Sequence, residues 1–285
     1  MQLRSAQWAM WNLRPTALYL PQLPSSPIFW TPHIFARLRI YRRQNQRHMT
    51  HSLRNLPLFS GSYADLVQEI QDYVQNPANP PAHLVTLNPE IWVDSVTHPA
   101  LNTAIHSARW ITADGVGIVL GQRLLGIKPS PRRTGSDLTP ELLKIQSLRF
   151  FLMGSTMDVV DAAVNHIQTH YPNAIIAGHR DGFFPLTDLP HIAETLGQCR
   201  PDIILVGMGS PRQDIVISEL KKSVSHGVFI GVGGVIDMLA GTVKRSPKWM
   251  QTLGIEWLWR LTLQPQRIIR LLKTIPRFIR VIWGS

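Results

Sequence analysis

The fold is decided by three segments of the sequence: Thr86-Leu87-Asn88, Thr112-Ala113-Asp114-Gly115-Val116-Gly117 and Arg132-Arg133-Thr134-Gly135-Ser136-Asp137-Leu138. Each is polar or glycine-rich and follows a short apolar run. In open α/β sheets, ligands bind at strand ends of this kind. Asp114 is a lone carboxylate in a tight loop, with no His or Cys beside it that would suggest a metal site. The segments therefore predict a ligand site centred on Asp114.

Outward from these segments, short apolar runs alternate with runs of helical spacing. Strands are predicted at residues 83–87, 110–112, 148–153, 174–177, 202–206 and 228–232. Helices are predicted at residues 63–74, 99–107, 119–125, 157–170, 188–199 and 213–223. Apolar strands that alternate with helices indicate a mostly parallel sheet with helices on both faces. We therefore expect a Rossmann-like α/β fold.

The net charge of +11 is concentrated at the two ends of the chain. Residues 1–48 contain seven Arg and no acidic residue, and residues 244–285 contain nine Lys or Arg and one Glu, so residues 49–243 carry the difference, −4. An acidic body with basic ends argues against a nucleic-acid groove across the core. It favours contact of the ends with a phosphate-bearing ligand or an anionic membrane surface.

These differences divide the chain into three parts. Residues 1–48 form a basic, proline-rich extension that we expect to be disordered, and Met49 is a candidate start of the protein. Residues 49–243 form the α/β domain, and residues 244–285 form a basic C-terminal appendage. The single Cys199 excludes an internal disulfide framework and fits a reducing compartment.

The appendage has the composition of amphipathic helices. Its Trp, Leu and Ile residues are interleaved with Arg260, Arg267, Arg270, Lys273, Arg277 and Arg280. Pro265 and Pro276 are expected to break or kink a helix here, which would leave two or three short helices. No apolar run reaches the ~20 residues that span a bilayer. The pattern favours helices that lie on a membrane surface, and a helix pair packed on the body is the alternative.

A dinucleotide site is one possible use of the central loop. Gly115, Gly117 and Gly121 follow a short strand, as in the dinucleotide-binding fingerprint. The third glycine is one residue late, however, and Asp114 would face the pyrophosphate. A nicotinamide-dependent oxidoreductase is therefore an alternative function.

Phosphate recognition without a metal ion is the other use of the strand ends. No Asp-x-Asp sequence and no Cys pair indicates a divalent metal site. Backbone amides of glycine-rich turns can cradle a pyrophosphate, and Arg132 and the arginines of the appendage could supply positive charge. The glycines of these turns are Gly154, Gly207, Gly209 and Gly233.

With these residues in place, the chain resembles the WecG/TagA/CpsF glycosyltransferases (glycosyltransferase family 26) over about residues 56–275. The family's motifs stand here in order: Thr-x-Asn at 86–88, Ala-Asp-Gly-x-Gly-x-Val at 113–119, Arg-x-Thr-Gly-Ser-Asp-Leu at 132–138, Gly-x-Gly-x-Pro-x-Gln at 207–213, Gly-Val-Gly-Gly at 231–234, Ala-Gly-Thr-Val-Lys-Arg-Ser-Pro-Lys-Trp-Met-Gln at 240–251 and Gly-Ile-Glu-Trp-Leu-Trp-Arg-Leu at 254–261.

The resemblance implies an inverting, metal-independent transfer of an N-acetylmannosamine-type sugar from a UDP-sugar to undecaprenyl-diphosphate-linked N-acetylglucosamine, in cell-wall or surface polysaccharide synthesis. It implies no cofactor besides the donor substrate and no nucleic-acid partner. Residues 49–243 would be the catalytic domain, and the enzyme would lie peripherally on the cytoplasmic face of a bacterial membrane. A homo-oligomer stays open.

By the same resemblance, Asp114 is the general base that removes the acceptor hydroxyl proton. An inverting transfer needs one base on the face opposite the departing UDP. The implied substrate-binding residues are Thr86, Asn88, Arg132, Gln213, Arg260, Arg267 and Arg270. The first two would position the sugars, the next two would bind polar groups of donor or acceptor, and the three appendage arginines would close over the site and meet the diphosphate.

Structural roles stay open for several of these side chains. Asp114 could cap a helix, and Asn88 before Pro89 could be a turn residue. Asp137 is expected to cap a helix that starts near Thr139, so it is left out of the catalytic set. A non-catalytic, membrane-associated scaffold is a further alternative for the whole chain.

Overall fold

The computed structural model describes residues 51–53, 55–253, 255–263 and 267–283, which all belong to one compact unit, Asn45–Ser285. The predictions for residues 1–48, and for Met49 as the start, lie outside the described residues. The predicted boundary between residues 243 and 244 stays a prediction.

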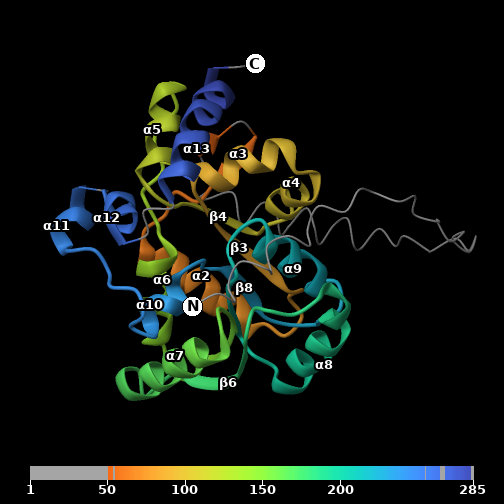
Figure 1. Cartoon of the computed structure of the whole chain (residues 1–285). Coiled ribbons are helices and arrows are strands. Elements are labelled where there is room, and N and C mark those ends of the chain that lie inside the picture. Colours follow the sequence, from red (N-terminus) through yellow and green to blue (C-terminus); the bar gives the residue numbers. More distant parts are fainter. Residues whose placement is uncertain (1–50, 54, 254, 264–266, 284–285) are drawn as a thin grey trace, which may run out of the picture. The chain divides into compact units, whose positions relative to one another are not determined.

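A six-stranded sheet forms the centre of the described chain (Figure 1). Its strands are β3 (Ala82–Leu87), β4 (Trp110–Ala113), β5 (Arg149–Gly154), β6 (Ile175–Arg180), β7 (Ile203–Gly207) and β8 (Val228–Gly231). All neighbours are parallel, in the order β4-β3-β8-β7-β5-β6. The predicted mostly parallel sheet is therefore confirmed. A short antiparallel pair that was not predicted, β1 (His51–Leu53) and β2 (Leu56–Leu58), precedes it.

Helices cover both faces of the sheet, as predicted. In one group, α2 (Tyr63–Gln75) contacts α6 (Gly135–Leu143), α6 contacts α10 (Val235–Leu239), α10 contacts α7 (Met157–His170), and α7 packs on β5 and β6. The other packs around β3, β7 and β8: α3 (Pro89–Thr97), α4 (Pro99–His106), α8 (Leu189–Cys199) and α9 (Arg212–Leu220). The described chain also contains α5 (Val116–Leu124) and a 3-10 turn at Leu186–Asp188. Each strand–helix unit thus returns the chain to the same edge of the sheet.

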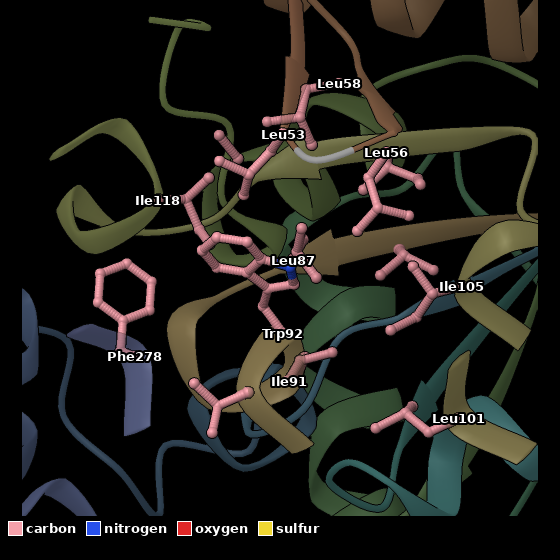
Figure 2. Packing of buried hydrophobic residues seen from close by; sticks show 14 of the residues in the cluster. Leu53, Leu56, Leu58, Leu87, Ile91, Trp92, Leu101, Ile105, Ile118 and Phe278 are labelled. Carbon is pink, nitrogen blue, oxygen red and sulfur yellow. The ribbon is translucent and has the colours of Figure 1, made fainter. Parts of the chain in front are cut away.

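Burial explains why the strands are so apolar. Every residue of β3, β4, β7 and β8 is buried, as expected for strands with helices on both sides. One apolar cluster joins β3 and β4 to α3, α4 and α5, and Figure 2 shows its packing around Trp92 and Leu87. A second cluster joins β5, β7 and β8 to α8 and α9.

The C-terminal appendage consists of α11 (Lys248–Leu253), α12 (Glu256–Leu263) and α13 (Arg267–Trp283). Phe278 and Ile282 of α13 are buried in the first cluster, and the Phe278 ring meets Trp92 edge-on at 5.4 Å. The expectation of helices in this part is confirmed. Pro276, however, lies inside α13 and does not end it. Among the described residues, no helix combines the length and the apolar character required to cross a bilayer.

Several helices differ from the sequence expectation: α10 was not predicted, and α5 begins at Val116 rather than at residue 119. Residues 89–97 form α3, which was not predicted. The helix starts here because Asn88 caps it and Pro89 occupies its first turn. Helix α6 begins at Gly135 rather than near Thr139, and its N-cap is Thr134. The predicted capping role of Asp137 is therefore wrong, since Asp137 lies in the first turn and bonds side chains instead.

Candidate active site

Asp114 leaves β4 at the carboxyl edge of the sheet. Its backbone N–H donates to the Leu87 carbonyl at 2.8 Å, which continues the β3–β4 pairing by one residue. The cap of α5 is Gly115, whose φ of 88° suits glycine, so the alternative that Asp114 itself caps the helix is wrong. The backbone of the half-buried Asp114 is thus held at the end of β4.

Asn88 follows β3 and lies beside this loop. Its side-chain oxygen accepts from the Ile91 N–H at 2.9 Å, which leaves the amide NH2 as the group able to contact a substrate. A Cβ at Gly117 would collide with the Pro89 ring, so the starts of α3 and α5 pack without a gap. The segments that contain Asn88 and Asp114 therefore pack directly against each other.

Arg132 reaches the same edge from a separate segment. Residue 132 forms a parallel bridge with Ala113, and the Arg133 N–H donates to the Ala113 carbonyl at 2.8 Å. The three segments that open the sequence analysis therefore converge, as predicted from their strand-end positions.

Thr86 and Gln213 both contact the loop after β8. The buried Thr86 hydroxyl donates to the Gly231 carbonyl at 2.8 Å, and the Gln213 side-chain oxygen accepts from the Gly233 N–H at 3.2 Å. Gln213 is only 2% exposed. Both side chains therefore support the loop, and direct substrate contact by either stays a prediction.

The glycine-rich turns meet at the ends of β5, β7 and β8. A Cβ at Gly154 would lie 2.8 Å from Gly207 Cα, and one at Gly207 would lie 2.7 Å from the Gly233 carbonyl oxygen. Only glycine, which has no Cβ, allows these backbone segments to approach one another so closely. Gly209 and Gly233 have φ angles of 76° and 54° and no atom within 4 Å of the Cβ position, so there is open space beside both residues, although the Gly233 N–H is already bonded to Gln213.

Sequence reasoning missed polar residues at this edge. Ser155, with φ of 51°, donates its hydroxyl to Asp237 at 3.0 Å. The two aromatic rings of the neighbouring loop Gly182-Phe183-Phe184 differ in exposure: the Phe184 ring is buried, whereas Phe183 is 76% exposed. The Gly182 N–H donates to the Ser155 carbonyl at 2.9 Å, which places this exposed ring next to the glycine turns. The residue order Gly-Ser before a helix was the signal for Ser155, whereas nothing local marks Asp237.

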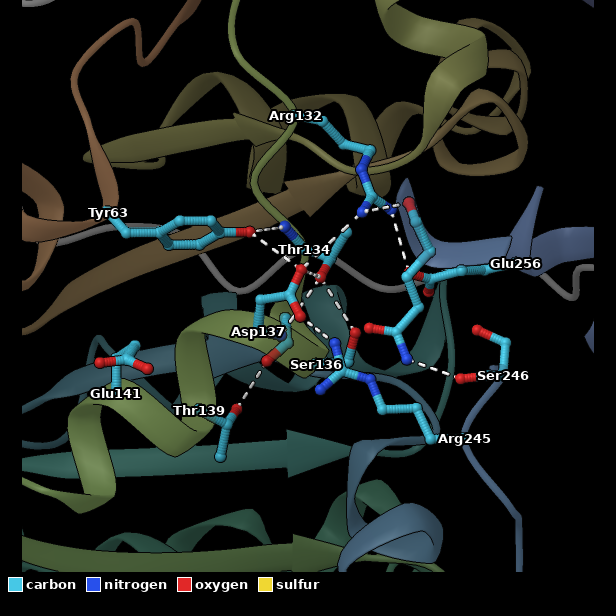
Figure 3. Close-up of polar contacts among 12 residues, drawn as sticks. Tyr63, Arg132, Thr134, Ser136, Asp137, Thr139, Glu141, Arg245, Ser246 and Glu256 are labelled. Atoms are coloured by element: carbon cyan, nitrogen blue, oxygen red, sulfur yellow. Dashed lines mark hydrogen bonds and ion pairs between the residues drawn. The ribbon is translucent and has the colours of Figure 1, made fainter. Parts of the chain in front are cut away.

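Arg132 is one of four charged side chains that lie in a row and contact one another (Figure 3). Arg132 donates to Glu256 of α12 at 3.2 Å and to the Gln251 carbonyl at 3.1 Å, and it lies 4.0 Å from Asp137. Asp137 also bonds Arg245, and it accepts from the hydroxyls of Thr134 and Tyr63 at 2.9 and 3.3 Å. Arg132 is thus engaged by the appendage.

The appendage arginines are placed only in part. Arg270 lies 4.0 Å from Glu90 in the first turn of α3, two residues after Asn88. Arg260 and Arg267 belong to α12 and α13, and their side chains lie outside the described residues. Arg270 thus lies near the start of α3, on the side of the candidate site. Closure of the appendage arginines over the site stays a prediction.

A buried ionisable pair lies behind the site. His83 of β3 faces Asp214 of α9 with Nε2 and Oδ1 3.6 Å apart, and both side chains are fully buried. Burial lowers the pKa of His83 to about 3, and burial raises the pKa of Asp214 to about 6. Near neutral pH the histidine is therefore uncharged, and Asp214 lacks a cationic partner in His83.

Metal ligands were not expected from the sequence. His166 and His170 stand one turn apart on α7 with their rings stacked at 4.1 Å. Over the described ranges, no group of three or more His, Cys, Asp or Glu is arranged to hold a metal ion.

A parallel sheet with a carboxylate, an amide and glycine turns at its carboxyl edge is typical of α/β enzymes that bind their ligands at strand ends. The chain belongs to the WecG/TagA/CpsF family of glycosyl transferases, whose family model matches residues 51–285. It is similar to the N-acetylglucosaminyldiphosphoundecaprenol N-acetyl-beta-D-mannosaminyltransferase of Bacillus subtilis (strain 168), with 32% identity over 80% of this chain and 89% of the relative. The protein of that name from Staphylococcus aureus (strain NCTC 8325 / PS 47) is 36% identical over 75% and 84%.

Membership of this family confirms that the chain is a glycosyltransferase. The oxidoreductase and scaffold alternatives receive no support. The strand order differs from the 3-2-1-4-5-6 order of dinucleotide-binding domains. Gly117 packs on Pro89, and Gly121 packs on Phe278, so these glycines serve helix packing.

Proposed function

We propose that the chain transfers an N-acetylmannosamine-type sugar from a UDP-sugar to an undecaprenyl-diphosphate-linked N-acetylglucosamine, with inversion and without a metal ion or other cofactor. The names of both relatives support the sugar and the acceptor. The observation that carries the proposal is the convergence of Asp114, Asn88 and Arg132 with the glycine turns at one sheet edge.

Asp114 is the general base in this proposal. The acceptor hydroxyl oxygen forms a bond to the anomeric carbon while the bond from that carbon to UDP breaks, and the hydroxyl proton passes to the Asp114 carboxylate. Support comes from the fixed position of Asp114 at the end of β4, because a base must be held in place to act. The NH2 group of Asn88 is available to orient a sugar hydroxyl.

The departing diphosphate meets backbone amides and cations. The open space beside the Gly209 backbone supports an anion cradle, and the exposed Phe183 ring of the neighbouring loop offers a stacking surface for the uracil base. Arg132 and the appendage arginines would offset the charge that develops on UDP, since arginine forks match phosphate oxygens.

The appendage and α5 would hold the enzyme on an anionic membrane surface. A Cβ at Gly121 would lie 3.0 Å from the Phe278 ring, so α5 and α13 pack closely, side by side (Figure 1). Helix α13 leaves an apolar strip exposed at helical spacing, Ile268, Leu272, Ile275, Ile279 and Trp283, and α5 leaves Val116, Leu120 and Leu124 exposed. Arg270, Lys273, Arg277 and Arg280 repeat at helical spacing on another side of α13, as in interfacial helices.

The deciding experiment measures transfer from UDP-N-acetylmannosamine to a short-chain lipid-diphosphate N-acetylglucosamine in the presence of EDTA. We expect turnover by the wild type and a loss of at least about 100-fold in Asp114→Asn, within the range general-base catalysis contributes. Equal turnover by both proteins would exclude Asp114 as the base. Turnover that requires Mg²⁺ would overturn the metal-independent step, and no product with any UDP-sugar would overturn the proposed donor.

A further inference from the structure

The two halves of the appendage contact the body through different chemistry. Helix α13 inserts Phe278 and Ile282 into the apolar cluster. Helices α11 and α12 instead leave Trp249, Trp257 and Leu258 exposed by 60, 47 and 40%. Met250 of α11 is buried, but the contacts between these two helices and Arg132 are polar (Figure 3).

The charges around Arg132 alternate in sign. The order Glu256–Arg132–Asp137–Arg245 places each inner charge between two opposite ones. Arg132 and Asp137 belong to the segment next to Asp114, whereas Arg245 and Glu256 flank α11. The chain of charges therefore fastens both ends of the segment from 245 to 256.

Partial burial makes these contacts responsive to salt. The side chains of Glu256 and Arg132 are 14% and 25% exposed, so solvent screens their attraction incompletely but still reaches it. Arg132 has further N–H groups beyond the two that bond Glu256 and Gln251, so it can meet a substrate phosphate while it holds the appendage.

We propose that Glu256 is a positioning residue for the transfer: through Arg132 it holds α11 and α12 closed against the carboxyl edge of the sheet, as an electrostatic latch that opens while α13 stays packed. The inference rests on the proposed function for its effect on turnover, but the latch itself is measurable without substrate.

Hydrogen–deuterium exchange of the full chain tests the latch. Glu256→Gln is compared with Glu219→Gln, which neutralises a glutamate of α9 that forms an exposed ion pair with Lys222, just after that helix. We expect amides of residues 256–263 to exchange about five-fold faster in Glu256→Gln, with residues 270–283 unchanged. Raising NaCl from about 0.05 M to about 0.5 M should speed exchange of the same segment in the wild type. Arg245→Gln should give the same pattern at residues 248–253.

Two outcomes overturn the latch. Suppose that exchange changes less than about two-fold at residues 256–263 in Glu256→Gln and at residues 248–253 in Arg245→Gln. This result would show that the charges do not hold the segment. Equal acceleration of residues 270–283 would show that the appendage opens as one unit.

Kinetics test the positioning role. We expect Glu256→Gln to lower kcat about ten-fold and to change the KM of the donor less than about two-fold, with Glu256→Asp partly restoring kcat. Unchanged kcat would overturn the positioning role while the exchange result stood. Absence of transfer by the wild type would count against the proposed function alone.

Discussion

The hydroxyl of Thr86 is hydrogen-bonded to the carbonyl of Gly231, 145 residues away in sequence, at 2.8 Å. This bond joins the ends of β3 and β8, the two strands at the middle of the candidate site. Since Gln213 supports the same loop through Gly233, two predicted substrate ligands converge on one piece of backbone.

Thr86→Val should therefore lower the free energy of unfolding by about 1–2 kcal/mol, because the buried Gly231 carbonyl loses its donor. Thr86→Ser keeps the hydroxyl and is the control. Urea denaturation measures stability, and the transfer assay measures kcat. If the serine variant loses as much activity as the valine variant, the hydroxyl is not the group that matters.

Gly154 tests the close approach of β5 and β7. Gly154→Ala should destabilise the fold by more than about 2 kcal/mol, since the added Cβ meets the Gly207 backbone. Gly197→Ala is the matched control: it lies inside α8 with nothing within 4 Å of the Cβ position, and alanine there should stabilise by about 0.5–1 kcal/mol. Thermal unfolding of both variants checks the opposite signs.

Asp214 predicts a pH-dependent stability difference. Its pKa rises from 3.8 to about 6 on folding, so the folded state holds the proton more tightly and its stability falls as pH rises through this window. The Asp214→Asn variant has no carboxyl group at this position, so it does not lose stability in this way as pH rises. Relative to wild type, the variant should gain up to about 3 kcal/mol between pH 4 and pH 7.

The contribution of His83 has the opposite sign and is common to both proteins. Its pKa falls from 6.5 to about 3 on folding, so stability decreases as pH falls below 6.5 in either protein. A stability difference between Asp214→Asn and wild type that does not vary from pH 4 to pH 7 would contradict the raised pKa of Asp214. Urea denaturation at each pH supplies the measurement.

The exposed strip on α13 predicts membrane binding. Leu272→Gln with Ile275→Gln should reduce co-sedimentation with anionic vesicles several-fold, because about 2 kcal/mol of apolar transfer is lost per side chain. Val96→Gln, which changes an exposed apolar residue on α3, is the control. Deletion of the appendage is less suitable, since it would uncover Trp92. Binding that is equal in all proteins would contradict a membrane role of the strip.

The sheet and the convergence at its edge could be predicted from sequence, because buried parallel strands are apolar throughout and their carboxyl ends share one side. Helix α3 was missed because Asn88-Pro89 suggests a turn, although the same pair starts helices. The charges around Arg132 could not be predicted, since Glu256 and Arg245 lie 124 and 108 residues from their partners. Only tertiary structure pairs them.

The contact between Gly117 and the Pro89 ring has a consequence for how substrates exchange. Since this contact leaves no free space between the starts of α3 and α5, these two starts cannot move closer together to tighten the gap between Asn88 and Asp114 around a substrate. Closure over a bound substrate must then come from parts of the molecule that surround these two loops.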